Sequence, residues 1–313
     1  MQNLLLAAEV VVPLLVLLAV GALVRACGIV DAATLTRVNR LIVYVALPSK
    51  CLLSLSESDL SRLSESAPVM LFIAAGILLV FLAAELIVPR LCSVPARRGV
   101  LVQALTRGND AVFGYAVASS LLPALELQQY LLSMAVSTPL FNMLGVLTLE
   151  LNRGDRVRFW PLVKKVATNP LSLGCIAGLL LNVLGVRLPR VLASPLQSLS
   201  ELTTPLAFIV LGSQLRFSSL YSNRKALAVL SFAKLALVPA IVLAVAMLLG
   251  FSGARLVCIF AIFTAPVALA SFPLACEYGG DEHLAGELVA VTSVLAIVTV
   301  FFFIFTMKQI GGF

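Results

Sequence analysis

The sequence is poor in charged residues and has almost no histidine. Only 12% of its 313 residues are charged and 61% are hydrophobic, whereas soluble domains carry about 25% charged residues. A water-soluble fold cannot bury that much apolar surface, so the composition excludes most soluble enzymes and predicts an integral protein of the lipid bilayer. The net charge of +7 then reflects basic loops at one membrane face and does not indicate a nucleic-acid partner.

The sequence also lacks the motifs of metal, cofactor and hydrolase sites. Its six cysteines include no CxxC pair, and its one histidine, His283, follows Asp281 and Glu282, so we expect buried thiols, no metal and no cofactor. No HExxH, GxSxG or Asp-rich prenyl-diphosphate motif is present. Gly279-Gly280-Asp281 is similar to the motif of intramembrane aspartyl proteases, but no second intramembrane aspartate is placed to form a dyad. A membrane-embedded enzyme is therefore the disfavoured class.

Ten apolar runs are candidates for helices that cross the bilayer. A crossing helix needs about 20 apolar residues, and the runs lie near 4–25, 37–56, 67–89, 99–122, 127–150, 168–187, 199–215, 226–250, 254–276 and 286–307. Their number and spacing predict an all-α fold in which short loops join ten transmembrane helices.

Basic residues alternate between the segments that join these runs. The first, third, fifth and seventh joining segments carry fourteen of them, while the second, fourth, sixth and eighth, together with the C-terminal tail, carry five. Because basic loops remain in the cytoplasm, the asymmetry predicts that both termini lie outside. The short loops, with no large insert, favour a bacterial inner (cell) membrane.

An internal repeat appears when the chain is shifted against itself by 157 residues. The shift superimposes four glycine or proline pairs, which are Pro13 with Pro170, Gly21 with Gly178, Gly28 with Gly185, and Pro48 with Pro205. Glycine and proline have backbone roles that other residues replace poorly, so the coincidence predicts duplicated structure. We expect one repeat at 1–151, a cytoplasmic linker at 152–167 and a second repeat at 168–313. Five helices per repeat would invert the second copy, an architecture typical of secondary transporters.

Two of the ten runs contain residues that disfavour a continuous helix. The fourth reads Arg107-Gly108-Asn109-Asp110 and the ninth reads Thr264-Ala265-Pro266. At a rise of about 1.5 Å per residue, Asp110 lies about 18 Å beyond Arg98 and Pro266 about 16 Å beyond Arg255, near the middle of a bilayer core about 30 Å thick. The sequence therefore predicts two helices broken at one depth, whose ends favour anions at N-termini and cations at C-termini.

Further polar residues are expected at this depth. Lys50 follows Pro48 in the second run, Asn142 lies in the fifth, and Lys234 lies in the eighth. Charged groups within a bilayer are costly and usually face a cavity or a partner. For Lys50 an anion contact is slightly favoured, whereas snorkelling or structural pairing explains Lys234 equally well. Arg107 and Asp110 are three residues apart, so an internal ion pair is the alternative to a binding role.

With these residues the chain resembles the auxin efflux carrier family, which includes bacterial dicarboxylate- and malonate-type permeases. The resemblance extends over nearly the whole chain and rests on Arg40 to Pro48, Gly108-Asn109 with Gly114, Asn169-Pro170, Pro205 to Gly212, Lys234 to Pro239, and Ala265-Pro266 to Asp281. It implies a scaffold group and a transport group of helices, the latter with two crossing broken helices. The chain departs from the family pattern at Ala116, where a proline is usual, at Asp110, and at Ser271.

The resemblance and the polar residues together predict a secondary active transporter, not an enzyme. The expected substrate is a small organic anion, such as a mono- or dicarboxylate or an auxin-like acid, moved by alternating access and linked to protons. We expect it to bind at Gly108, Asn109, Pro266, Lys50, Arg107 and Asn142, with Asp110 as the proton switch. The alternative is sodium coupling, as in bile-acid-type carriers, through the oxygens of Asn109, Asp110, Thr264 and Ser271. A homodimer is the oligomer considered.

Overall fold

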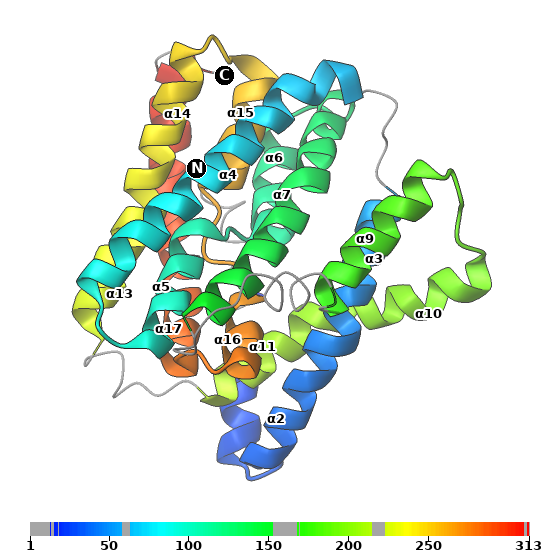
Figure 1. Cartoon of the computed structure of the whole chain (residues 1–313), viewed down its shortest axis with the longest axis vertical. Helices are drawn as coiled ribbons and strands as arrows, with labels where there is room; N and C mark the ends of the chain where they lie inside the picture. Colours follow the sequence, from blue (N-terminus) through cyan, green and yellow to red (C-terminus); the bar gives the residue numbers. More distant parts are fainter. Residues whose placement is uncertain are drawn as a thin grey trace.

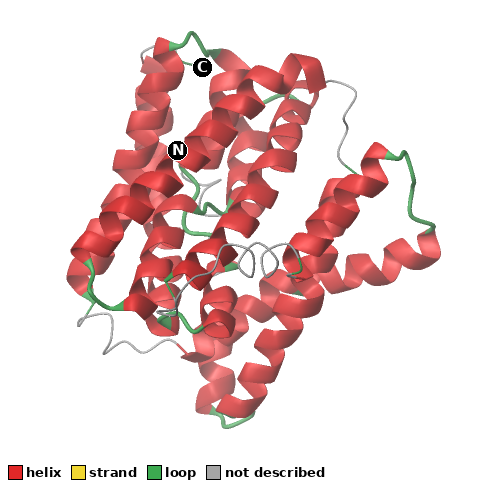
Figure 2. Cartoon of the chain, viewed as in Figure 1, coloured by secondary structure: helices red, strands yellow, loops and turns green. Residues whose placement is uncertain are grey.

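The protein is described by a computed structural model that covers residue 13, 16–17, 19–57, 63–152, 168, 170–214, 223–309 and 312. The described chain is helical throughout, with one isolated β-bridge and no strand (Figure 2). Its first repeat contains α2 (Ala32–Leu41), η1 (Ile42–Ala46), α3 (Leu47–Ser56), α4 (Leu63–Leu91), α5 (Pro95–Thr106), η2 (Asp110–Gly114), α6 (Tyr115–Leu121) and α7 (Ala124–Leu151). The rest contains α9 (Pro170–Val183), α10 (Arg190–Glu201), α11 (Thr203–Gln214), α13 (Arg224–Phe232), η3 (Ala233–Leu237), α14 (Val238–Leu248), α15 (Gly253–Phe263), α16 (Ser271–Tyr278) and α17 (Glu282–Gln309).

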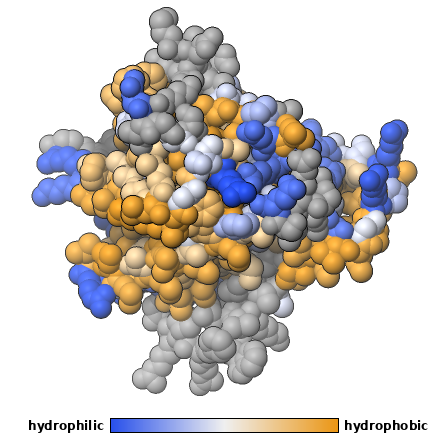
Figure 3. Space-filling view, turned by 90° about the horizontal axis from the view of Figure 1, so that it is seen from above, coloured by the Kyte–Doolittle hydropathy of each residue, from blue (hydrophilic) through white to orange (hydrophobic). Residues whose placement is uncertain are grey.

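Four stretches of the described chain are long and apolar enough to cross a membrane, namely 65–91, 125–151, 224–248 and 282–307. They carry exposed large apolar side chains such as Leu79 and Phe302, and hydrophobic residues cover a broad part of the surface in Figure 3. Surface of this kind needs lipid to cover it. The chain is therefore an integral membrane protein, while the number of ten spans stays a prediction because most of the first run lies outside the described residues.

The helices form two groups that meet along one boundary (Figure 1). In the first group α3 packs against α9 and α10, and α2 packs against α11. In the second group α4, α5 and α7 pack together, and α13, α14, α15, α16 and α17 pack around them. Two helix groups are what the family resemblance implies, and their roles as scaffold and transport group stay predictions.

The predicted seventh run, 199–215, differs from the observed elements. The chain forms a separate helix, α10, and turns at Leu202 into α11, which begins at Thr203. None of the residues of α10 is buried, and Gln197 Nε2 donates to Glu201 Oε1 at 2.8 Å. The sequence reading missed α10 because its polar side chains interrupt the apolar pattern used to find spans.

The internal repeat is visible in the backbone where each first helix of a repeat ends. Gly28 and Gly185, which are 157 residues apart, both have φ of 68°. At each helix end the glycine N–H donates to the carbonyl three residues earlier, from Gly28 N to Arg25 O at 3.1 Å and from Gly185 N to Asn182 O at 3.0 Å. The flanking bonds, from Ile29 N to Val24 O and from Val186 N to Leu181 O, repeat at the same offset. A left-handed residue at a helix C-terminus favours glycine, which explains why this pair was retained.

A second pair of glycines repeats a close contact between helices. A Cβ on Gly178 would lie 3.0 Å from the Cα atom of Leu52, and one on Gly21 would lie 3.0 Å from the Cα atom of Ile209. Leu52 and Ile209 are themselves 157 residues apart, so contacts as well as sequence are duplicated. Small residues let helix backbones approach closely within a membrane, as they do here between α3 and α9.

Two helices contain a π-helical turn just before a proline. η1 precedes Pro48 and η3 precedes Pro239, and in each case the helix continues on both sides. A proline lacks the N–H of an α-helical bond and its ring clashes with the carbonyl four residues earlier. A wider turn relieves the clash without ending the helix, and the second such turn places Lys234 in the interior.

We expect Gly178→Ala to destabilise the protein by about 1–3 kcal/mol, because the added methyl group enters the space occupied by the Leu52 backbone. The free energy of unfolding is measured by denaturant titration in detergent. The control is Leu180→Ala, which removes an exposed side chain of the same helix and should change stability by about 0.5 kcal/mol or less. Equal stability of Gly178→Ala and wild type would show that the two helices are not tightly packed.

Candidate functional site

The site is built around two broken helices that bind each other. α5 ends at Thr106 and α15 ends at Phe263, and neither helix resumes until several residues later. Between these breaks, Asn109 N donates to Pro266 O at 2.8 Å and Ala268 N donates to Arg107 O at 3.2 Å. These bonds join the two segments as a short antiparallel bridge. The breaks predicted from the sequence are thus observed, at the two positions that the 157-residue offset pairs.

The crossover is held by backbone N–H and C=O groups that would bond within the helix if the helix were continuous. Pro266 has no N–H, so it cannot return the bond that it accepts from Asn109. The carbonyl of Asn109 instead accepts from Phe113 N at 3.1 Å and Gly114 N at 3.0 Å, which starts the wide turn of η2. The crossing is therefore asymmetric, since helical structure resumes at Asp110 after one break and only at Ser271 after the other.

Glycine is required on both sides of this crossing. A Cβ on Gly108 would lie 2.9 Å from Ile262 O, and one on Gly114 would lie 2.8 Å from Ala261 O. Both contacts are with the last turn of α15. Larger residues would separate the two broken helices, which explains the spacing Gly108-Asn109 to Gly114 in the sequence.

A cavity of about 90 Å³ lies beside the crossover, where the two helix groups meet. Five of the predicted substrate-site residues line it, as does Asp110. The full wall consists of Ile42, Leu47, Lys50, Cys51, Arg107, Gly108, Asn109, Asp110, Ala111, Thr138, Phe141, Asn142, Thr203, Ala207, Ala268, Leu269, Ala270 and Pro273. η1, α3 and α11 of the first helix group therefore supply one wall, and the broken helices with α7 supply the other.

Three predicted site residues are not part of the cavity wall. Pro266 acts through its carbonyl, which binds Asn109. The hydroxyl of Thr264 donates to Phe260 O at 2.7 Å within its own helix, and Ser271 is buried with its hydroxyl lacking a partner in the described part of the chain. The oxygens proposed for a sodium site thus do not gather around one point of this cavity.

Arg107 is a buried cation with a neutral partner. Its guanidinium donates from Nη2 to Asn142 Oδ1, while Nη1 has no hydrogen-bond partner among the described residues. Gly145 leaves room for the group, since a Cβ there would lie 3.1 Å from Nη1. Within the described ranges no carboxylate forms an ion pair with it. The charge is therefore left without a paired counter-ion among the residues that the structure describes.

Asp110 binds hydroxyl groups, and the ion pair considered from its spacing to Arg107 is not formed. Ser137 Oγ donates to Asp110 Oδ2 at 2.5 Å and Thr138 Oγ1 donates to it at 3.2 Å. Ala111 N donates to the other carboxyl oxygen at 3.0 Å. Side chains three residues apart lie next to each other only on a helix. Arg107 has an extended backbone, so its side chain and that of Asp110 are not neighbours on one helix face.

Asn142 connects the cavity to the scaffold. Besides accepting from Arg107, its amide donates to Cys51 Sγ at 3.2 Å and to Cys175 Sγ at 3.8 Å. These thiols belong to α3 and α9. The sequence indicated a polar role for Asn142, but nothing in it showed that two scattered cysteines meet there.

Other site residues were missed by sequence reasoning. Ser137 and Thr138 precede Pro139 in α7, and Thr203 precedes Pro205 in α11. Hydroxyl residues beside a proline inside an apolar run were the available signal, because such side chains satisfy the backbone groups that the proline frees. Here Ser137 and Thr138 instead bind the acidic group of the cavity.

Polar contacts close the boundary between the helix groups at one side of the site. Asn39 Nδ2 donates to Pro273 O at 3.1 Å, and Tyr44 Oη donates to Glu277 Oε1 at 2.9 Å. Arg40 Nε lies 3.7 Å from Glu277 Oε2. All three link α2 and η1 to α16, next to the cavity-lining Pro273. They are the contacts that any separation of the two groups at this side has to break.

Comparison with known proteins identifies the family. A family model described as "Membrane transport protein" matches residues 6–159 and again 158–304, so it covers almost the whole chain in two consecutive copies. The chain is also 24% identical to a protein of Methanothermobacter thermautotrophicus named "Uncharacterized transporter", over 93% of this chain and 95% of that protein. The chain therefore belongs to the auxin efflux carrier-type family of membrane transport proteins.

Proposed function

We propose that the protein is a secondary active transporter of a small organic anion, a mono- or dicarboxylate, that works by alternating access and is linked to protons. The observation that carries the proposal is the charge of the cavity wall. Lys50 and Arg107 are cationic and Asp110 is the single acidic residue among the lining residues, which gives a formal charge of +1 with all three ionised. A buried cation without a counter-ion is costly, and a bound carboxylate offsets that cost.

The geometry of Arg107 suits a carboxylate. A guanidinium presents several donors in one plane and binds carboxylates through charge-assisted hydrogen bonds. One of its groups is held by the neutral Asn142, which fixes the side chain but leaves its charge available. The first turn of α16 also meets the cavity through Ala270 and Pro273, and a helix N-terminus favours an anion.

The size of the cavity favours a short anion. A volume of about 90 Å³ has room for several water molecules, since about 10–15 Å³ of such cavity volume holds one. A short mono- or dicarboxylate is of this size, whereas a ring-bearing auxin-like acid would need the helix groups to separate first. We therefore place the substrate among the small carboxylates.

Asp110 supplies a physical basis for linking the anion to a proton. Its carboxyl lines the same cavity as Lys50 and Arg107. When it is protonated the formal charge of the wall rises from +1 to +2, so a proton and an anion favour each other's binding. This coupling is reciprocal by thermodynamic linkage, and Ser137 and Thr138 can serve either protonation state because a hydroxyl both donates and accepts.

The duplicated architecture supports the proposal of alternating access. We propose ten spans in two inverted five-helix repeats, which let the two halves exchange conformations across the membrane. In the present state α2 and η1 are bound to α16 through Asn39, Tyr44 and Arg40, and transport requires these contacts to open in one state. We place the protein in a bacterial inner (cell) membrane with both termini outside.

Uptake of radiolabelled short carboxylates into proteoliposomes tests the anion site. Arg107→Gln removes the buried charge and should weaken binding about tenfold or more. Asn142→Asp keeps the Arg107 contact but supplies an internal counter-ion, so it should abolish uptake while the protein remains folded. Arg255→Gln, which changes an exposed arginine of α15, is the matched control. Wild-type uptake by both site variants would contradict the proposal.

The proton link is tested by the pH dependence of anion binding. Asp110→Asn mimics the protonated carboxyl, so at neutral pH it should bind the anion about fivefold tighter or more than wild type. Its affinity should no longer rise as pH falls, and an imposed pH gradient should no longer drive accumulation. Glu126→Gln, an exposed change in the first turn of α7, should behave as wild type. An unchanged pH profile in Asp110→Asn would remove Asp110 from the proton pathway.

A further inference from the structure

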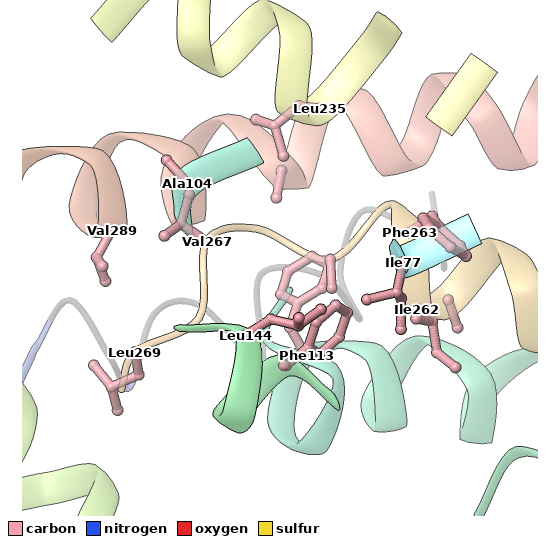
Figure 4. Close-up of a cluster of buried hydrophobic side chains, with 14 of the residues drawn as sticks. Ile77, Ala104, Phe113, Leu144, Leu235, Ile262, Phe263, Val267, Leu269 and Val289 are labelled. Atoms are coloured by element: carbon pink, nitrogen blue, oxygen red, sulfur yellow. The ribbon is translucent and has the colours of Figure 1, made fainter. Parts of the chain in front are cut away.

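Lys234 is a second buried cation near the crossover, and it does not line the cavity. It lies in η3 and is only 1% exposed. A Cβ on Gly108 would lie 3.6 Å from Lys234 Nζ and 2.9 Å from Ile262 O, so the ammonium and this carbonyl flank the same side of Gly108. Lys234 is not among the cavity-lining residues. Its neighbour in the sequence, Leu235, is one of the buried hydrophobic residues labelled in Figure 4.

Two helix C-termini converge at this point. α5 ends at Thr106, immediately before Arg107-Gly108, and α15 ends at Phe263, immediately after Ile262. The last carbonyls of a helix lack helical partners, and each helix C-terminus carries about half a unit of negative charge. Two such ends amount to about one negative charge, which one ammonium group balances.

Of the described carboxylates, that of Asp110 attracts Lys234 electrostatically, but its oxygens accept hydrogen bonds from Ser137, Thr138 and Ala111 N and form no ion pair with the ammonium. η3 packs against α5, α13, α14 and α17, and the charged residues on these helices include Arg97, Arg98, Arg224, Lys225, Glu282 and Glu287. Glu287 accepts from Asn223 Nδ2 at 2.8 Å. In the ranges that the structure describes, the ion pairs are Arg40 with Glu277 and Arg97 with Asp281, neither of which involves Lys234.

We propose that Lys234 is the built-in cation of the crossover, held where the C-termini of the two broken helices would otherwise attract a coupling cation. The ammonium is covalently fixed, so it stays at the crossing throughout transport and no metal ion has to enter. Lys234 is thus a positioning residue that holds the two helix ends together without touching the anion. The proposal deepens the proposed function, since it assigns the cation chemistry of the same crossing and argues against sodium coupling.

The first test measures thermal unfolding in detergent, with a thiol-reactive dye that reports exposure of the buried cysteines. Lys234→Ala removes three methylene groups and the ammonium, so its unfolding midpoint should fall below that of wild type. Propylammonium replaces the deleted atoms and should restore the midpoint, whereas choline at equal ionic strength should not because it is too large. Lys225→Ala, the same change at an exposed lysine of α13, should show neither the loss nor the restoration. Equal responses of Lys234→Ala to propylammonium and choline would overturn the proposal.

The second test uses the wild-type protein and needs no variant to fold. Its unfolding midpoint and its anion uptake should be the same in sodium and in choline, since Lys234 already occupies the cation position. A higher midpoint in sodium would show a separate cation site and would overturn the proposal. The unfolding measurements do not depend on transport, so a failure of the anion proposal would leave them intact, and the reverse also holds.

Discussion

The structure depends on hydrogen bonds between two helices that are each interrupted in the middle of the protein. Unpaired backbone groups are very costly in an apolar medium, so two breaks are tolerated only if each supplies partners for the other. Asn109 and Arg107 bind the backbone of Pro266 and Ala268 in this way. Everything polar in the site is arranged around this crossing, because it is where backbone ends, and their partial charges, are available.

Charge is distributed around the crossing in a consistent manner. On the cavity side, Arg107 and Lys50 exceed the single carboxyl of Asp110, which suits an anionic solute. Outside the cavity wall, Lys234 lies close to Gly108 and the C-terminal turn of α15, a position that suits a fixed cation. In the proposed account, the crossing thus has a cavity that binds and releases an anion, and a separate position where the fixed charge of Lys234 takes the place of a bound cation.

The sequence predicted the two helix breaks because glycine and proline have backbone requirements that can be recognised from the sequence alone. Gly108-Asn109 and Pro266 disfavour helix at one depth, and Gly28 and Gly185 mark equivalent helix ends. Side-chain partners were harder to predict. The ion pair between Arg107 and Asp110 assumed a helix that the break removes, and Asn142 meets Cys51 and Cys175 only because α3 and α9 pack closely. Those contacts join residues far apart in the chain, and no local pattern encodes them.

The most direct test is an experimental structure with a short brominated carboxylate, located by the anomalous scattering of bromine. The account predicts a bromine peak in the cavity beside Arg107, between the crossover and Lys50, with α5 and α15 both interrupted as described. A peak found only outside the cavity at saturating ligand, or unbroken helices through Asn109 and Pro266, would contradict it.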